Sequence, residues 1–122
     1  MKDKRYCIDY LEDILDAISK IHNFTIGLSE QEFLEDEKTA FAVIRALEII
    51  GEASKKIPDN LKIKHHEIPW REMSGLRDKL IHGYFVVNLA IVWKTIKRDL
   101  PEVEESIRDI IETERDSHIE RT

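Results

Sequence analysis

Apolar residues recur at intervals of three and four along most of this 122-residue sequence. The first such stretch carries Ile8, Leu11, Leu15 and Ile18. This spacing places side chains on one face of an α-helix, because a helix turns once in about 3.6 residues. Only 4 glycines and 3 prolines interrupt the pattern, so we expect long helices rather than many short strands.

Breaks in the apolar pattern divide the chain into helices. We expect helices over residues 4–22, from 29 towards 56, from 69 to 83, and from 88 onwards. Ser29 and Glu32 form a capping box at the start of the second helix, whose middle is apolar on most sides and should be the most buried. In the last helix the pattern continues past Pro101, which predicts either a kink or a short break there.

These helices predict an all-α, single-domain, up-and-down bundle of four to five helices over residues 1–116. Residues 117–122 have lost the apolar pattern and are expected to be a frayed tail. The N-terminus lacks the uninterrupted apolar core of a signal peptide, and no apolar run approaches the roughly 20 residues that span a bilayer. The expected location is the cytoplasm.

Charge is unevenly distributed along the chain. The net charge of −6 argues against indiscriminate nucleic-acid binding, which depends on neutralising phosphates. Residues 54–82, however, carry seven Lys or Arg against four Asp or Glu, a net charge of +3 that leaves −9 for the remainder. This basic middle either holds an anionic ligand or is a solvated segment with scattered lysines.

Metal ligands are poorly represented. Cys7 is the only cysteine, and neither C-x-x-C nor H-E-x-x-H occurs. The adjacent His65 and His66 cannot easily converge on one ion, and His22 and His118 are isolated. We therefore interpret all four histidines as surface or capping residues and expect neither a metal nor another cofactor.

The stretch GLRDKLIHGYF, residues 75–85, combines helix-forming leucines with Arg77, Asp78, His82 and Tyr84. On an ideal helix Asp78 and His82 share a face, whereas Arg77 and His82 point about 140° apart. If Gly83 ends the helix, the unpaired carbonyls of the last turn and the carboxylate of Asp78 favour the protonated form of the His82 imidazole. This suits His82 to acid–base chemistry. The planar guanidinium of Arg77 is suited to binding phosphate. The structural alternative is an ion pair beside a capping histidine.

The segment RDKLIHGY matches the R-x4-H-x-Y signature of the HepT-like toxins, a branch of the HEPN superfamily. The similarity also includes VIRALEIIGEASKKI, IPWREMSGLRDKLIHGYF and VWKTIKRDLPEVEESI, in the same order, and covers about residues 8–112. The chain therefore resembles HepT-like toxins over most of its length.

This resemblance implies a metal-independent endoribonuclease of a type VII-like toxin–antitoxin system that acts on mRNA or tRNA as a homodimer. Arg77 and His82 would be the catalytic pair, and Asp78 a polar helper. Tyr84 matches the tyrosine that a minimal nucleotidyltransferase antitoxin AMPylates in similar toxins. Because the Arg77 and His82 side chains would point in different directions on a helix, a site shared between two protomers is consistent with their spacing.

Glu52 lies on a largely apolar helix and should have a partner, because burying a lone carboxylate is costly. Arg45, Arg71 and Arg77 are candidates, so Glu52 either holds Arg77 in place or forms a structural ion pair. Trp70 and Trp93 are interpreted as core anchors rather than base-stacking platforms.

Two other functions compete with the ribonuclease. The chain could be a non-catalytic helical partner of a nucleotidyltransferase, although a scaffold would not need the R-D-x3-H-x-Y set. It could also be a nucleotide-binding subunit in which Arg77 holds a triphosphate, but no Gly-rich phosphate loop is present.

Overall fold

The computed structural model describes the backbone of residues 4–76 and 89–121, and the side chains of residues 7–76 and 89–116. All regular structure in these ranges is helical, as the sequence predicts. The elements are α1 (Lys4–Thr25), α2 (Glu30–Glu35), α3 (Glu37–Lys55), α4 (Asp59–Lys64), α5 (Trp70–Ser74), α7 (Leu89–Lys94), the π-helical turn η1 (Thr95–Asp99) and α8 (Leu100–Arg121). No helix within these ranges is long and apolar enough to cross a membrane.

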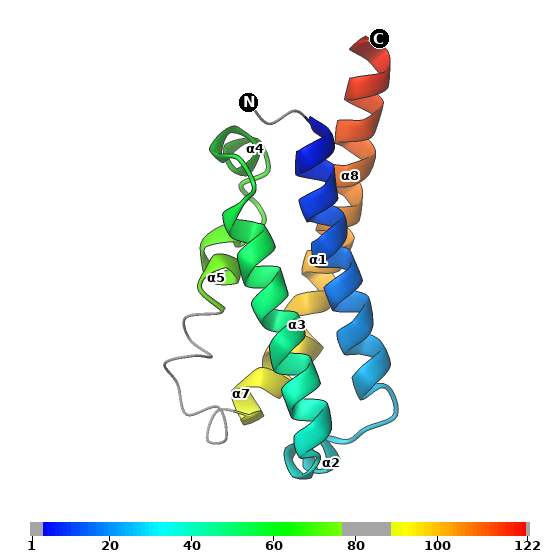
Figure 1. Cartoon of the computed structure of the whole chain (residues 1–122), viewed down its shortest axis with the longest axis vertical. Helices are drawn as coiled ribbons and strands as arrows, with labels where there is room; N and C mark the ends of the chain where they lie inside the picture. Colours follow the sequence, from blue (N-terminus) through cyan, green and yellow to red (C-terminus); the bar gives the residue numbers. More distant parts are fainter. Residues whose placement is uncertain (1–3, 77–88, 122) are drawn as a thin grey trace.

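Three long helices form the body of the bundle. Helix α1 packs against both α3 and α8, which run in the direction opposite to α1 (Figure 1). The short helix α2 lies at the turn between α1 and α3, while α5 packs on α3. Helix α7 and η1 lead into α8. The N-terminal end of α1 and the C-terminal end of α8 therefore lie at the same end of the bundle.

The core consists of the apolar faces of these three helices. Leu11 and Ile14 of α1, and Val43 and Ile50 of α3, are completely buried, as is Ile107 of α8. Each such side chain contributes about 1.5–3 kcal/mol of transfer free energy. Helix α3 packs against α1, α2 and α5, which confirms its prediction as the central helix.

The capping box at the start of the second predicted helix is confirmed. The Ser29 side-chain oxygen accepts from the Glu32 backbone N–H at 3.1 Å, and Glu32 Oε1 accepts from the Ser29 N–H at 2.9 Å. The helix that follows is not continuous, however: α2 ends at Glu35 and α3 begins at Glu37. The prediction of one helix from 29 to 56 is wrong at this point.

Asp36 causes the break between α2 and α3. Its Oδ1 accepts from the Thr39 backbone N–H at 3.0 Å and its Oδ2 from the Thr39 hydroxyl at 2.6 Å. These bonds make Asp36 the N-cap of α3, a position that requires a non-helical backbone. The Thr39 hydroxyl, followed by the Thr39 N–H, lowers the pKa of the Asp36 carboxyl.

Pro101 does not break the last helix. The backbone N–H of Leu100 donates to the carbonyl of Thr95, the bond of a π-helical turn, and α8 continues directly from Leu100. Pro101 thus occupies the first turn of α8, where its missing N–H costs least. The backbone of α8 extends to Arg121, past the end of the apolar pattern.

Candidate functional site

Four of the predicted site residues, Arg77, Asp78, His82 and Tyr84, lie in residues 77–88, outside the described residues. The structure describes the two segments that join this stretch to the bundle, together with the surface around them.

The N-terminal flank is α5 and the two residues after it. Trp70 and Met73 are buried, and Trp70 Nε1 donates to the His65 carbonyl at 3.0 Å. The helix predicted from Pro69 begins as expected, with Pro69 as its N-cap, but α5 ends at Ser74. Gly75 is the C-cap, and its N–H donates to the Arg71 carbonyl at 3.0 Å. Glycine favours this ending because it is a poor helix former.

The C-terminal flank is α7, which is also held by the core. Leu89 and Val92 are buried. Trp93 packs on Phe33 of α2, with ring centroids 5.2 Å apart and an interplanar angle of 36°. Lys97 Nζ lies 4.7 Å from the centroid of the Trp93 ring. These contacts agree with the prediction that the tryptophans are core anchors.

Glu52 is half-buried on α3 and engaged in an interaction. This agrees with the expectation that a carboxylate on an apolar helix needs a partner. The proposed role of Glu52 in holding Arg77 depends on a residue outside the described ranges.

A buried polar cluster that the sequence did not predict connects α8 to the end of α4. Glu114 is 2% exposed, and its Oε2 accepts from Lys64 Nζ at 2.9 Å and lies 3.2 Å from His65 Nε2. His65 is the C-cap residue of α4, which agrees with its interpretation as a surface or capping residue, but its side chain is only 12% exposed and contacts Glu114. The signal was present: Glu114 continues the apolar spacing of Ile107 and Ile111.

The other histidines agree with the sequence interpretation where the structure describes them. His22 lies exposed in the last turn of α1, and His66 is exposed after α4. The side chain of His118 is outside the described set. In the part of the chain that is described, no group of three or more His, Cys, Asp or Glu side chains is placed to hold a metal ion.

Two hollows lie beside α5 and differ in charge. The first, the acidic groove, lies between α5 and the η1–α8 segment and has a volume of about 440 Å³. Its apolar floor includes Met73 and Leu100. Among the described residues, those that line it and carry a charge are all acidic, namely Glu67, Glu72, Asp99 and Glu102.

The second, the basic hollow, lies between α4 and α5 and has a volume of about 520 Å³. Lys62, His66 and Arg71 line it, together with the carboxylates Asp59 and Glu72. It also presents the exposed side chain of Ile63. The two hollows thus offer a phosphodiester very different surroundings on the two sides of α5.

Comparison with known proteins places the chain in a family. The sequence pattern of the Ribonuclease HepT-like family matches residues 14–110, which include both flanks and the stretch between them. The chain belongs to the HepT-like ribonuclease family. RNA is therefore the substrate class that membership in this family implies.

Individual relatives agree with this assignment. The chain is 59% identical over 100 residues to a protein named "Probable ribonuclease HepT" from Thermococcus cleftensis, an alignment that covers 82% of this chain and 91% of the relative. It is 42% identical over 106 residues to a protein provisionally named as an RNase from Caldanaerobacter subterraneus subsp. tengcongensis, covering 87% of this chain and 95% of the relative. A similarly named protein of Methanocaldococcus jannaschii is 44% identical over 108 residues, with coverage of 88% and 89%. No solved structure matches the chain.

Proposed function

We propose that this HepT-like chain is a metal-independent endoribonuclease, the toxin of a toxin–antitoxin pair, and that Arg77 and His82 carry its chemistry. The observation that carries the proposal is the R-D-x3-H-x-Y set at residues 77–84, within a chain whose family is named for a ribonuclease. The buried anchors Met73 and Leu89 on either side support it, because a catalytic segment must be held by a rigid framework.

The proposed reaction is transesterification within the RNA strand. His82 removes the proton of a ribose 2′-hydroxyl, whose oxygen forms a bond to the adjacent phosphorus. Arg77 stabilises the extra negative charge on the pentavalent phosphorus, and Asp78 orients the polar groups. The bond from phosphorus to the 5′-oxygen then breaks, and that oxygen receives a proton. The products are a 2′,3′-cyclic phosphate and a 5′-hydroxyl.

An RNA cleavage assay in EDTA tests the catalytic pair. We expect the native protein to cleave cellular RNA, whether mRNA or tRNA, and to leave 2′,3′-cyclic phosphate ends. Arg77→Ala and His82→Ala should each lower the rate by at least about 100-fold, the usual effect of removing a charge-stabilising or proton-transferring group. Cleavage that stops in EDTA would contradict metal independence, and equal cleavage by all three proteins would remove both residues from the mechanism.

We also propose that a minimal nucleotidyltransferase antitoxin neutralises the protein by AMPylating Tyr84. The tyrosine oxygen would attack the α-phosphate of ATP and release pyrophosphate. The added phosphate brings negative charge and bulk to a site that must hold RNA phosphates.

Intact-mass measurement tests this regulation. Incubation with such an enzyme and ATP should add the mass of one or more AMP units to the native protein and none to Tyr84→Phe. The modified protein should no longer cleave RNA. An unchanged mass of the native protein would refute the regulatory proposal and leave the nuclease proposal standing.

Glu52 is proposed as a supporting residue that acts through Arg77. Under this proposal Glu52→Gln lowers RNA cleavage while the unfolding transition stays close to that of the native protein. A structural ion pair would give the reverse, a lower unfolding temperature with cleavage retained at temperatures where the variant is folded.

A further inference from the structure

The surface beside α5 divides into two sides of unlike charge, and this division bears on how RNA reaches the protein. Arg71 and Glu72 are neighbours on α5, yet only Glu72 lines the acidic groove. Arg71 lines the basic hollow together with Lys62 of α4, and Glu72 lines that hollow as well. An RNA strand is a polyanion, so the four described carboxylates of the acidic groove disfavour it, whereas in the basic hollow Lys62 and Arg71 offset the charges of Asp59 and Glu72.

The cations of the basic hollow are available to a ligand. The side chains of Lys62 and Arg71 make no ion pair or hydrogen bond with any described residue. The Lys64 side chain, by contrast, forms an ion pair with Glu114, and Lys56 Nζ lies 5.6 Å from the centroid of the Tyr10 ring. Two basic side chains of this region are thus already engaged, while those that line the hollow are not.

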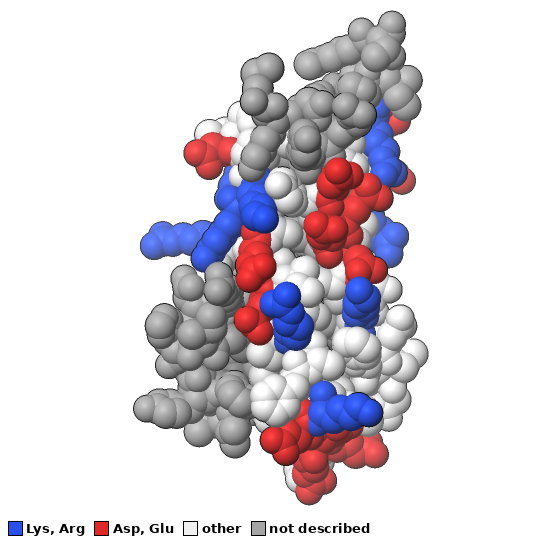
Figure 2. All heavy atoms as spheres, in the orientation of Figure 1, with Lys and Arg blue, Asp and Glu red and all other residues white. Residues whose placement is uncertain are grey.

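Acidic and basic side chains also gather at different places on the wider surface. On the face shown in Figure 2, Asp and Glu side chains gather over the α2 end of the bundle and along α1, whereas Lys and Arg side chains project near the C-terminal end of α3. Helix α4 follows that end of α3 and has Lys62 and Lys64 in its last turn. Helix α4, which forms one wall of the basic hollow, therefore follows an end of α3 where basic side chains project on this face.

The lining of the hollow also suits a single strand. Unpaired nucleotides need cations for their phosphates and flat or apolar groups for their bases. The guanidinium of Arg71 supplies a charge and a plane, and Ile63, which is 74% exposed, supplies apolar surface at the same hollow. The carboxylates Asp59 and Glu72 limit the affinity of the hollow for RNA. They therefore favour contact with a few phosphates over non-specific binding.

We propose that the basic hollow between α4 and α5 is a phosphate-binding subsite for single-stranded RNA. The proposal rests on the proposed function and adds to it the surface that holds the strand beside the catalytic segment. Leu76, the last described residue before Arg77, is five residues from Arg71, so at most about 18 Å of chain separates them. The chain length alone therefore keeps Arg77 within about 22 Å of Arg71, a span of a few nucleotides.

The salt dependence of RNA binding tests the subsite without requiring cleavage. Fluorescence anisotropy would measure the affinity of a labelled single-stranded RNA for the full chain with His82→Ala, at several salt concentrations. Adding Lys62→Gln and Arg71→Gln should weaken binding and make the slope of log affinity against log salt shallower by about 1.4, since each phosphate contact with a single strand contributes about 0.7.

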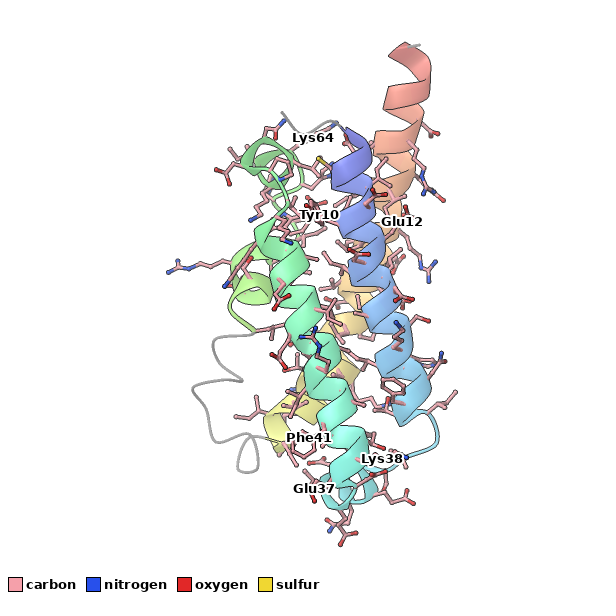
Figure 3. The ribbon with its side chains drawn as sticks, in the orientation of Figure 1. Tyr10, Glu12, Glu37, Lys38, Phe41 and Lys64 are labelled. Atoms are coloured by element: carbon pink, nitrogen blue, oxygen red, sulfur yellow. The ribbon has the colours of Figure 1, made fainter. Side chains whose placement is uncertain are left out.

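Lys38→Gln is the matched control. Lys38 is exposed near the start of α3, at the end of the bundle opposite Lys64 (Figure 3). We expect it to leave the slope unchanged, and thermal unfolding should show that all variants remain folded. An unchanged slope in the double variant, an equal change in the control, or no RNA binding at all would overturn the subsite. Failure of the native protein to cleave RNA, with the salt effect present, would overturn the nuclease proposal alone.

Discussion

Among the described residues, Glu114 is the one charged side chain that is buried. A carboxylate at 2% exposure is stable only when it is paired, and Glu114 is paired with Lys64 and His65. Lys64 is half-exposed, so its contact is screened by water, whereas His65 is largely buried. The cluster fixes the end of α4, and with it one wall of the basic hollow.

Removing this carboxylate should therefore destabilise the fold. We expect Glu114→Ala to lower the free energy of unfolding by about 2 kcal/mol, the usual cost of deleting a buried charged hydrogen-bond partner. Urea unfolding measures the change. The control is Glu105→Ala, an exposed position on the same helix, which should stay within about 0.5 kcal/mol of the native protein. Equal effects at both positions would show that the cluster adds nothing to stability.

At the scale of the elements, Asp36 separates α2 from α3. The pKa of its carboxyl is lowered by the Thr39 hydroxyl and backbone N–H, so the ionised form is favoured in the folded state. A carboxyl with a lowered folded-state pKa stabilises the fold above its unfolded pKa and loses that contribution as the pH falls through the folded value. The capping contribution should be complete at pH 7 and decline below about pH 4.

Thermal unfolding of Asp36→Ala between pH 7 and pH 3 tests this capping role. The variant should unfold at a lower temperature than the native protein at pH 7, and the gap should narrow as the pH decreases. Asp109→Ala, an exposed position on α8, should show a small gap that changes little with pH. A gap for Asp36→Ala that stays constant across the range would mean that the ionised carboxylate is not what caps α3.

The elements also show what sequence could and could not predict. Long helices such as α1 and α3 were predictable because their apolar spacing repeats over several turns. Helix α4 was not predicted, because a helix of six residues is too short to show a period. The break at Asp36 was missed because both flanking helices continue one apolar pattern, and only the cap reveals it. The burial of Glu114 could be predicted from its spacing after Ile107 and Ile111, but its contact with Lys64, 50 positions away, is encoded by no local pattern.

At the scale of the whole molecule, the proposed site raises the question of how many chains it needs. Arg77 and His82 are five residues apart and would point about 140° from each other on an ideal helix. One chain then has difficulty bringing both to the same phosphate. A two-fold dimer solves this, because Arg77 of one protomer can meet His82 of the other. We propose that the nuclease is a homodimer with two such composite sites.

Mixing two inactive variants gives a decisive test. A heterodimer of Arg77→Ala and His82→Ala subunits has one site that lacks both groups and one that retains Arg77 and His82 from different chains. With random pairing about half of the dimers are mixed, so composite sites predict about a quarter of the native RNA cleavage rate from two proteins that are inactive alone. Sites contained within single chains predict no recovery, because every protomer then lacks one of the two groups.

Co-expression with two different affinity tags isolates the heterodimer, whose rate should approach half that of the native dimer. Mass measurement in solution establishes that two chains are present. A monomer that cleaves RNA would exclude the shared site, and the guanidinium and imidazole would then have to converge within one chain through a backbone that departs from a regular helix.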